Sequence, residues 1–371
     1  MYYKLFLSPL NFPVNYTDII DRIHSLNPVK YGNDRNFIDG SVSYLSPYIS
    51  RGVISTRQVY EMLIGKNFAE ERIEKFIQEL AWRDYWQLIW KHHGASINFD
   101  FRHPQKQPNR SGFPSAMVTA ATGIEAIDHE INRLYTEGYM HNHVRMYVAS
   151  MACNLAHCQW KSPAQWMYYH LLDADWASNA LSWQWVCGTF NNRFYYANQE
   201  NINTYCRTAQ QNTFLDVDYS TFDLLQIPNE LEAIETLQFT TPLPETDVPT
   251  LDAHLPTFIY NFYNLDPTWR SDLSGNRILL LEPSIFEEYP ISEKSLQFCI
   301  DLAKTNIPDI QIWVGEFKEL QAQVNGEIYF KEHPLNSYAG IEDSRDWLSI
   351  DRGDFPSFFS FWKKCKKHLK P

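Results

Sequence analysis

The sequence predicts a mainly α-helical fold that is followed by a small C-terminal α/β unit. Hydrophobic residues recur with the helical period of about 3.6 residues throughout residues 17–190. Four prolines follow in the run TPLPETDVPTLDAHLP at 241–256, which is typical of a linker. Beyond this run, short apolar stretches alternate with a helical one. We therefore expect a helical domain over 1–240, a linker over 241–275 and an α/β domain over 276–371.

The helices expected in the first region are separated by Pro, Gly and Asn. They cover residues 17–26, 55–65, 70–93, 123–137, 142–158, 163–171 and 176–187. Residues 94–121 form a long, partly polar connection between two of these helices. Connections of this length in compact domains tend to be functional or mobile.

The last region has the pattern of a parallel sheet. Strands are expected at 276–283, 310–317 and 327–333, with a helix at 293–306 between the first two. This strand–helix–strand order indicates a small parallel α/β unit. The tail FFSFWKKCKKHLKP predicts an amphipathic basic helix with a solvated face rather than a membrane anchor.

Composition excludes several classes of protein. No apolar run approaches the roughly 20 residues needed to cross a membrane, and only 14 glycines are present, without a glycine-rich phosphate loop. Six cysteines without a CxxC pair predict reduced thiols in a cytoplasmic protein, and no His or Cys spacing predicts a metal site. The net charge of −12 lies in the second half, which disfavours non-specific nucleic-acid binding but allows a local basic patch.

Three segments place polar groups among aromatic side chains. On the helix expected over FIQELAWRDYWQLIW, one face carries Glu79, Trp82, Arg83, Trp86 and Trp90. The simpler interpretation of this face is an aromatic core stripe with an intrahelical Glu79–Arg83 pair. GYMHNHVRM, at 138–146, has the same mixed character.

The stretch LLDADWASNALSWQWVCGTF raises the same question more sharply. Asp175 suits the N-cap of a helix that begins near 176, and Asn179 and Trp183 then share one face. Asp173 has no such role, so it needs a cationic partner, for which Arg145 is a candidate. Taken together, the three segments predict a large planar polar ligand held between aromatic helices.

These segments resemble the FAD-binding helical domain of the DNA photolyase/cryptochrome superfamily. The four motifs that carry the resemblance, in the family's order, are VSYLSPYISRGVIS (42–55), ELAWRDYW (79–86), TGIEAIDHEINRLYTEGYMHNHVRM (122–146) and LLDADWASNALSWQW (171–185). The resemblance covers roughly residues 10–200. It implies an all-helical, FAD-binding domain.

Position by position, the resemblance also implies roles in binding FAD. Tyr31, Ser43, Leu45 and Ser46 would contact the pyrophosphate. The other cofactor-binding residues would be Glu79, Arg83, Asn142, Arg145, Asp173, Asp175 and Asn179. Among these, Asp173 would pair with Arg145 beneath the isoalloxazine ring, Asp175 would reach the ribose or the flavin edge, and Asn179 would face flavin N5.

The same resemblance implies two catalytic groups of residues. Trp183 would be the proximal electron donor to photoexcited FAD, and Trp160 the next link. In photolyases, the positions of Glu79, Trp82, Asn142, Met146 and Trp185 line the cavity that receives a flipped-out pyrimidine dimer. Flipping is needed because chemistry on a stacked base is sterically blocked.

The sequence departs from the family at several places. Tyr44 stands where the phosphate loop commonly has arginine, and His143 replaces an arginine near the DNA-facing cavity. The outermost tryptophan of the usual electron chain falls near Gln107, so that relay is cut or rerouted. The segment after Trp185 leaves the family's pattern, and an α/β unit follows the helical domain where the family has one before it.

Three interpretations follow. The chain is a light-driven FAD enzyme that repairs pyrimidine dimers in damaged DNA, or a light or redox sensor that signals to a protein partner through its acidic C-terminal half. The third interpretation is a scaffold that has lost FAD, which the buried charges disfavour. Repair ranks slightly ahead, because the cavity residues have no evident purpose in a sensor.

Overall fold

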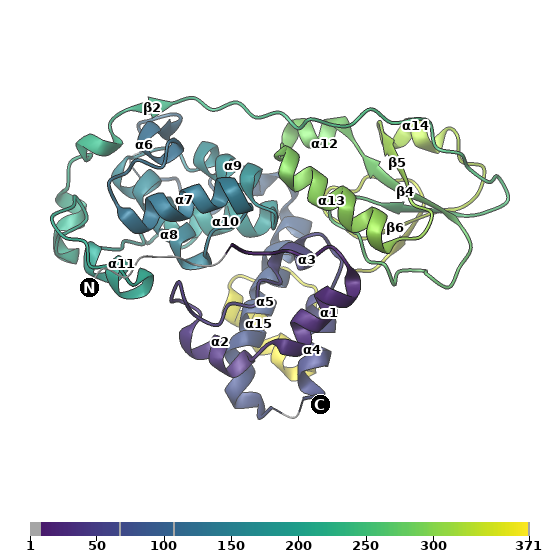
Figure 1. Cartoon of the computed structure of the whole chain (residues 1–371), viewed down its shortest axis with the longest axis horizontal. Helices are drawn as coiled ribbons and strands as arrows, with labels where there is room; N and C mark the ends of the chain where they lie inside the picture. Colours follow the sequence, from purple (N-terminus) through teal and green to yellow (C-terminus); the bar gives the residue numbers. More distant parts are fainter. Residues whose placement is uncertain (1–8, 67, 107, 370–371) are drawn as a thin grey trace.

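The computed structural model describes residues 9–66, 68–106 and 108–369. Figure 1 shows a helical part and an α/β part, joined by an extended segment that runs along the top of the view after β2. The expected order of a helical region and then an α/β unit is therefore confirmed in part. The expectation of a mainly helical fold is confirmed in part, since five strands form a parallel sheet beside the helices.

The helical part contains short and long helices that follow one another closely. Its α-helices are α1 (Tyr16–Ser25), α2 (Pro28–Asp34), α3 (Ser46–Ser50), α4 (Thr56–Ile64), α5 (Glu70–His93), α6 (Ser115–Val118), α7 (Glu125–Glu137), α8 (Asn142–Ser150), α9 (Lys161–His170), α10 (Trp176–Val186) and α11 (Gln199–Cys206). Shorter helical turns are η1 (Gly94–Asn98), η2 (Met151–Leu155), η3 (Tyr219–Leu224) and η4 (Asn229–Leu231). A small antiparallel pair joins β1 (Phe113–Pro114) to β2 (Ile234–Glu235).

Helix α5 is the centre of this part and spans the 70–93 segment that the sequence predicts. It contacts α2, α4 and α10. The helix stops at Gly94, whose φ of +52° suits glycine better than residues with a side chain. Because α5 lies between the other helices, its side chains reach both α3 and the start of α10.

The helix expected over 142–158 is interrupted. Helix α8 ends at Ser150 and continues as the π-helical turn η2. The Asn154 amide in this turn donates hydrogen bonds to the carbonyls of Val186 and Tyr195, at 3.2 and 2.8 Å. A side chain that bonds to neighbouring backbone in this way accompanies the change of helical register, which hydrophobic periodicity does not reveal.

The α/β part is built on a parallel sheet with strand order β5-β4-β3-β6-β7. The strands are β3 (Thr257–Tyr260), β4 (Asn276–Leu281), β5 (Gln311–Val314), β6 (Ile328–Lys331) and β7 (Ile341–Asp343), with helices α12 (Pro283–Glu288), α13 (Glu293–Asn306) and α14 (Phe317–Gln321). The predicted strands and helix of this unit are present. The linker predicted over 241–275 is too long, because β3, the central strand, lies within it.

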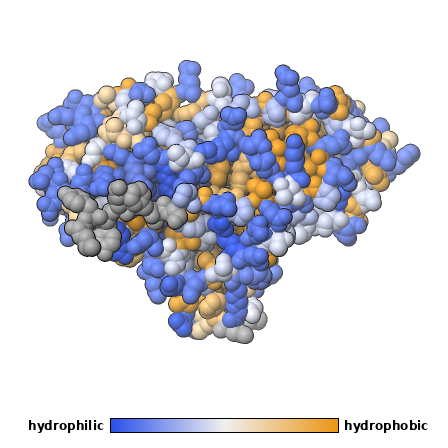
Figure 2. Space-filling model, in the orientation of Figure 1, coloured by the Kyte–Doolittle hydropathy of each residue, from blue (hydrophilic) through white to orange (hydrophobic). Residues whose placement is uncertain are grey.

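The last helix, α15 (Phe358–His368), belongs by its contacts to the helical part. It contacts α5 rather than covering the sheet. The boundary drawn for the α/β domain at 276–371 therefore includes a segment that returns to the helical core (Figure 1). Within the described residues, no helix has the length and apolar character needed to cross a membrane. Figure 2 shows hydrophilic side chains over much of one face, with hydrophobic ones gathered in its centre and toward the α/β part.

Candidate functional site

The first element of the site is an ion pair between α8 and the segment before α10. Both oxygens of Asp173 accept hydrogen bonds from Arg145, from Nη1 and Nη2, each at 3.1 Å. Burial by itself would raise the pKa of Asp173, but Arg145 and Arg83 hold that pKa below its usual value. The structure therefore forms the bidentate Arg145–Asp173 pair that the sequence predicts.

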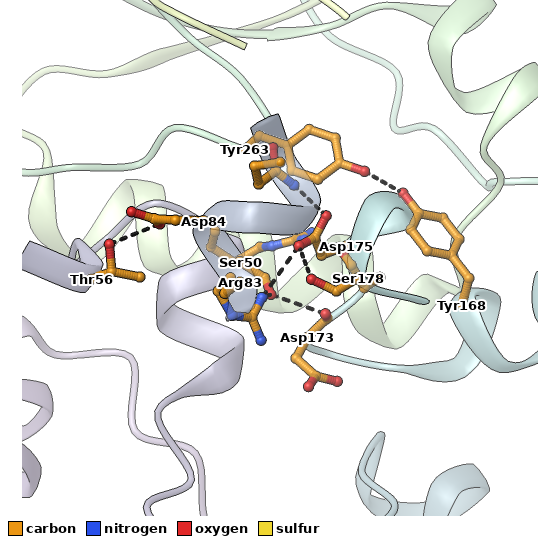
Figure 3. A network of polar contacts seen from close by, with 12 residues as sticks. Ser50, Thr56, Arg83, Asp84, Tyr168, Asp173, Asp175, Ser178 and Tyr263 are labelled. Atoms are coloured by element: carbon orange, nitrogen blue, oxygen red, sulfur yellow. Dashed lines mark hydrogen bonds and ion pairs between the residues drawn. The ribbon is translucent and has the colours of Figure 1, made fainter. Parts of the chain in front are cut away.

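Asp175 lies at the centre of a second group of contacts (Figure 3). Its Oδ1 accepts a hydrogen bond from Gln87 Nε2 at 2.6 Å, and its Oδ2 accepts one from Ser178 Oγ at 2.7 Å. Arg83 Nη1 lies 3.4 Å from the same Oδ2. Asp175 occupies the N-cap position of α10, but its side chain caps no backbone N–H. The predicted capping role is wrong, because side chains of α5 and α10 use its carboxylate instead.

Arg83 of α5 contacts residues of α3 and of the segment before α10. Besides contacting Asp175, its Nη1 donates to Ser50 Oγ on α3 at 2.7 Å, and Ser50 Oγ donates to the Asp173 carbonyl at 3.0 Å. The Glu79–Arg83 pair expected on the simpler interpretation of α5 is not formed. Glu79 instead lies 3.3 Å from Arg35 and 3.1 Å from Lys75.

A residue from the returning C-terminal segment also reaches this group. Arg345 Nη1 donates to Gln87 Oε1 at 2.7 Å, and Gln87 in turn donates to Asp175. Asp84, one turn earlier on α5, accepts from Thr56 Oγ1 at 2.9 Å and from the Leu348 N–H at 2.7 Å. Burial raises the pKa of Asp84, and Arg345 opposes that rise. The polar centre of the helical part is therefore completed by residues that follow the sheet.

The expected phosphate loop borders a cavity of about 290 Å³. Its lining residues are Arg22, Ser25, Leu26, Asn27, Ser41, Val42, Ser43 and Tyr44. Tyr44 adopts a left-handed φ of +52°, an uncommon conformation for a residue with a side chain. Arg22 of α1 supplies a guanidinium here, although the loop itself carries Tyr44 where the family has arginine.

The other residues predicted for the phosphates lie around this loop. Leu45 is buried and does not line the cavity, and its N–H donates to Ser43 Oγ at 3.4 Å. Ser46 begins α3 and contributes to the lowered pKa of Asp173. Tyr31 lies apart from the cavity lining, with its ring edge-on to Phe76 of α5 at 4.9 Å.

The residues expected to receive a pyrimidine dimer have mixed surroundings. Asn142 is exposed, whereas Met146 and Trp185 are half-buried. Trp82 is also half-buried, and the Phe358 ring of α15 lies flat against its indole, with a 3.7 Å centroid separation and a 7° interplanar angle. One face of the expected base-stacking indole is thus covered by the chain's own C-terminal helix.

The tryptophans expected to carry electrons are both buried. Trp183 is 2% exposed and Trp160 is 3% exposed. Trp160 Nε1 donates to Asp100 Oδ1 at 2.9 Å, which fixes its indole against the 94–121 connection. Asn179 is half-buried, and its amide nitrogen donates to the Ala164 carbonyl at 2.8 Å, which leaves its amide oxygen and its second N–H to meet a ligand. Gln107 lies outside the described residues.

The two histidines of GYMHNHVRM are structural. His141 is 2% exposed, and its Nδ1 accepts the His143 N–H at 3.2 Å. Burial lowers the pKa of His141 to about 4. His143 Nδ1 lies 3.1 Å from the Asn36 carbonyl, and its ring is edge-on to Tyr205. Burial lowers the pKa of His143 too, so it does not replace the family's arginine as a permanent cation.

A second place where α/β folds bind ligands is closed. Ligands of open parallel sheets bind beyond the carboxyl ends of strands where the strand order reverses. Here that position lies between β3 and β6, and close to it Glu282, directly after β4, accepts a hydrogen bond from the Tyr338 hydroxyl at 2.7 Å. The cavity beside them measures about 20 Å³, which is room for a water molecule.

Several residues of the site were missed in the sequence. Gln87 and Ser178 had a local signal, since Gln87 follows Arg83 by one helical turn and Ser178 follows Asp175 by three residues. Arg345 and Phe358 had none, because they reach α5 from more than 250 residues away in the sequence. Such contacts depend on tertiary structure, which periodicity and spacing do not encode.

The residues present fit FAD. The cavity beside α1 offers a guanidinium, hydroxyls and an amide, which is a donor set suited to a pyrophosphate. Asp173 and Asp175 are 6% and 3% exposed, and each lies next to a guanidinium. Carboxylates buried at this depth need such partners, and the half-buried Asn179 offers amide groups to a polar ligand.

Comparison with known proteins gives the same assignment. Residues 76–218 match the family model described as the FAD binding domain of DNA photolyase. The deoxyribodipyrimidine photo-lyase of Agrobacterium fabrum is 32% identical over 155 residues, which are 40% of this chain and 32% of that enzyme. Cryptochrome-1 of Sinapis alba is 29% identical over 175 residues, covering 42% of this chain and 34% of that protein. The chain spans about a third of the length of these curated relatives.

Solved structures were also compared. A cryptochrome of Synechocystis sp. PCC6803 gives a TM-score of 0.48 at 23% identity, covering 53% of this chain and 44% of that one. A class III photolyase of Agrobacterium tumefaciens gives 0.44 at 21% identity, covering 57% and 54%. Residues 76–218 of this chain are therefore similar to the FAD binding domain of DNA photolyase, and FAD is the cofactor that this similarity supports.

Proposed function

We propose that this chain is a photolyase-like flavoprotein that uses light-driven electron transfer to repair pyrimidine dimers in DNA. The observation that carries the proposal is the convergence of the predicted motifs on one site. Arg145–Asp173 and Arg83–Asp175 lie side by side there, and Arg83 bonds to Ser50 of the first motif. Trp82 lies one position before Arg83 on α5 and is accessible in part.

The chain's own residues would hold the cofactor in two places. Ser43 and Arg22 would bind the phosphates at the cavity beside α1. Arg145, Asp173 and Asn179 would contact the flavin. Bound FAD would supply absorption of light and one-electron transfer.

On the DNA side, Trp82, Met146 and Trp185 would contact the extruded bases. An extruded pyrimidine pair needs apolar and aromatic surface to replace its lost stacking, and these side chains offer it. Asn142, which is exposed, adds an amide that can hydrogen-bond to a base edge.

One observation favours a second function, light or redox sensing without repair. Phe358 covers one face of Trp82, so less of that indole is available to a base. The acidic second half of the chain, outside α15, is also better suited to a protein partner than to DNA.

The test is repair of a dimer-containing oligonucleotide under blue light by FAD-loaded, reduced protein, with a dark sample as the control. Light-dependent loss of the dimer is expected. FAD-loaded protein that photoreduces but leaves the dimer intact would favour the sensor, and protein that does not take up FAD would contradict both functions. The Trp183→Phe variant should photoreduce FAD more slowly while binding it equally well, and an unchanged rate would contradict the electron role given to Trp183.

A further inference from the structure

The positive charge of the second half is concentrated on α15 and its flanks. Residues 357–371 contain five lysines and no Asp or Glu, whereas residues 211–356 carry 26 acidic against eight basic residues. A helix this basic within so acidic a surrounding presents a local positive surface that the net charge of −12 conceals.

The apolar face of α15 is buried against the rest of the protein. Phe358, Phe361, Trp362 and Cys365 are 3, 0, 7 and 0% exposed. Phe361 stacks with Tyr85 of α5 at a centroid distance of 5.9 Å. A lipid surface would need this apolar face, so its burial disfavours a membrane as the partner of α15.

The opposite face of α15 is open to solvent. Phe359 is 69% exposed, and Lys363, Lys364 and Lys367 are exposed as well. Lys366 pairs with Glu74 at 2.8 Å, but no ion pair involves the other three lysines within the described residues. On a helix, Phe359 and Lys363 are one turn apart, and Lys367 follows by another turn, about 6 Å further along the axis.

This face borders the aromatic site. Phe358 stacks on Trp82, the indole that the proposed function assigns to the lesion, and Phe359 is the next residue of the helix. Lys363 lies five residues after Phe358, about 7.5 Å further along the helix axis. Lysines spaced along a helix neutralise successive phosphates, and an exposed aromatic ring stacks on an unpaired base. An acidic protein partner would account for the exposed lysines but not for the exposed Phe359 ring.

We propose that the exposed face of α15, formed by Phe359, Lys363, Lys364 and Lys367, binds the phosphate backbone of a DNA strand next to Trp82. The inference rests on the proposed function for the identity of its partner. It assigns DNA binding to the element that follows the α/β unit rather than to the position of His143.

The test is binding of full-length protein to a fluorescein-labelled, undamaged single strand in the dark, at several salt concentrations. The Lys363→Gln/Lys367→Gln variant should weaken binding and reduce the slope of log K against log salt by about 1.4, because each phosphate contact contributes about 0.7. The matched control, Lys304→Gln/Lys318→Gln, removes the same charge from exposed positions of the α/β part and should leave the slope unchanged.

A second variant separates stacking from charge. Phe359→Ala should weaken single-strand binding by about tenfold and leave both the salt slope and duplex binding nearly unchanged. Equal losses in both lysine variants, or wild-type binding by all of them, would overturn the proposal and leave an acidic protein as the partner class for α15. Since the assay needs neither light nor flavin, a chain that binds through α15 but repairs no dimer would contradict only the proposed function.

Discussion

At the scale of single residues, the pair between Arg145 and Asp173 has the largest expected energetic consequence. Arg145→Met leaves the Asp173 side chain, 4% exposed, without its bidentate partner. We expect the free energy of unfolding to fall by about 3 kcal/mol at pH 7, because an uncompensated buried carboxylate is strongly destabilising. Urea denaturation measures this change. The Arg145→Met/Asp173→Asn double variant is the control and should recover part of the loss, and failure to recover any would show that the pair is not the cause.

His141 is expected to make stability depend on pH. Its pKa is lowered from 6.5 to about 4, its Nε2 has no hydrogen-bond partner in the described structure, and its folded form is neutral. The folded state binds this proton less readily than the unfolded state, so the stability is complete above pH 6.5 and is lost as pH falls toward 4. The loss attributable to this residue is about 3 kcal/mol.

The measurement for His141 is the free energy of unfolding of the wild type and His141→Gln at successive pH values. The difference between the two proteins should shrink as pH falls from 7 to 4, because the glutamine cannot take up a proton. A difference that is constant across this range would mean that His141 is not buried as a neutral ring.

At the scale of elements, the two adjacent phenylalanines of α15 provide a matched comparison. Phe358 is 3% exposed and stacks on Trp82, whereas its neighbour Phe359 is 69% exposed. Phe358→Ala should lower the free energy of unfolding by about 3 kcal/mol and change the fluorescence of Trp82. Phe359→Ala should change stability by less than about 0.5 kcal/mol. If both variants lose equal stability, α15 does not dock on α5 through Phe358.

Much of the element layout could be predicted from the sequence, and the exceptions have physical reasons. The span of α5 follows from its 24 residues of helical pattern, and α10 begins next to Asp175 as expected. Strand β3 has only four residues, buried on both faces, directly after a proline-rich run, so no alternation marked it. The docking of α15 on α5 could not be predicted, because an amphipathic pattern shows that a face is buried but not which element covers it.

At the scale of the whole molecule, the contacts of the site with distant parts of the sequence could not be predicted either. The motifs from α5, α8 and α10 predicted the Arg145–Asp173 pair because all three belong to the helical region. Arg345 completes the environment of Asp175 from beyond the sheet, and its contact with Gln87 joins residues 258 positions apart. The polar centre of the helical part is therefore completed by the segment that returns to it after the sheet.

Because Arg345 lies outside the helical motifs but contributes to this polar centre, we expect a change at Arg345 to alter the affinity for FAD. Arg345→Ala removes the donor that orients Gln87, so Gln87 no longer holds Asp175 in one position. We expect the free energy of unfolding to fall by about 2 kcal/mol, the value of a hydrogen bond that involves a charged group. The dissociation constant for FAD should rise by about tenfold, measured by fluorescence titration of the free flavin.

Two comparisons separate this effect from general destabilisation. Arg352→Ala, on the same returning segment, removes an exposed arginine 3.9 Å from Glu332 and should leave FAD affinity unchanged. Guanidinium ion at non-denaturing concentration should restore affinity to Arg345→Ala, because it can occupy the space of the missing side chain and donate to Gln87. It should not restore affinity to Arg345→Ala/Gln87→Leu, which lacks the acceptor. Rescue of both variants alike, or a normal FAD affinity in Arg345→Ala, would show that the returning segment does not act on FAD binding through Gln87.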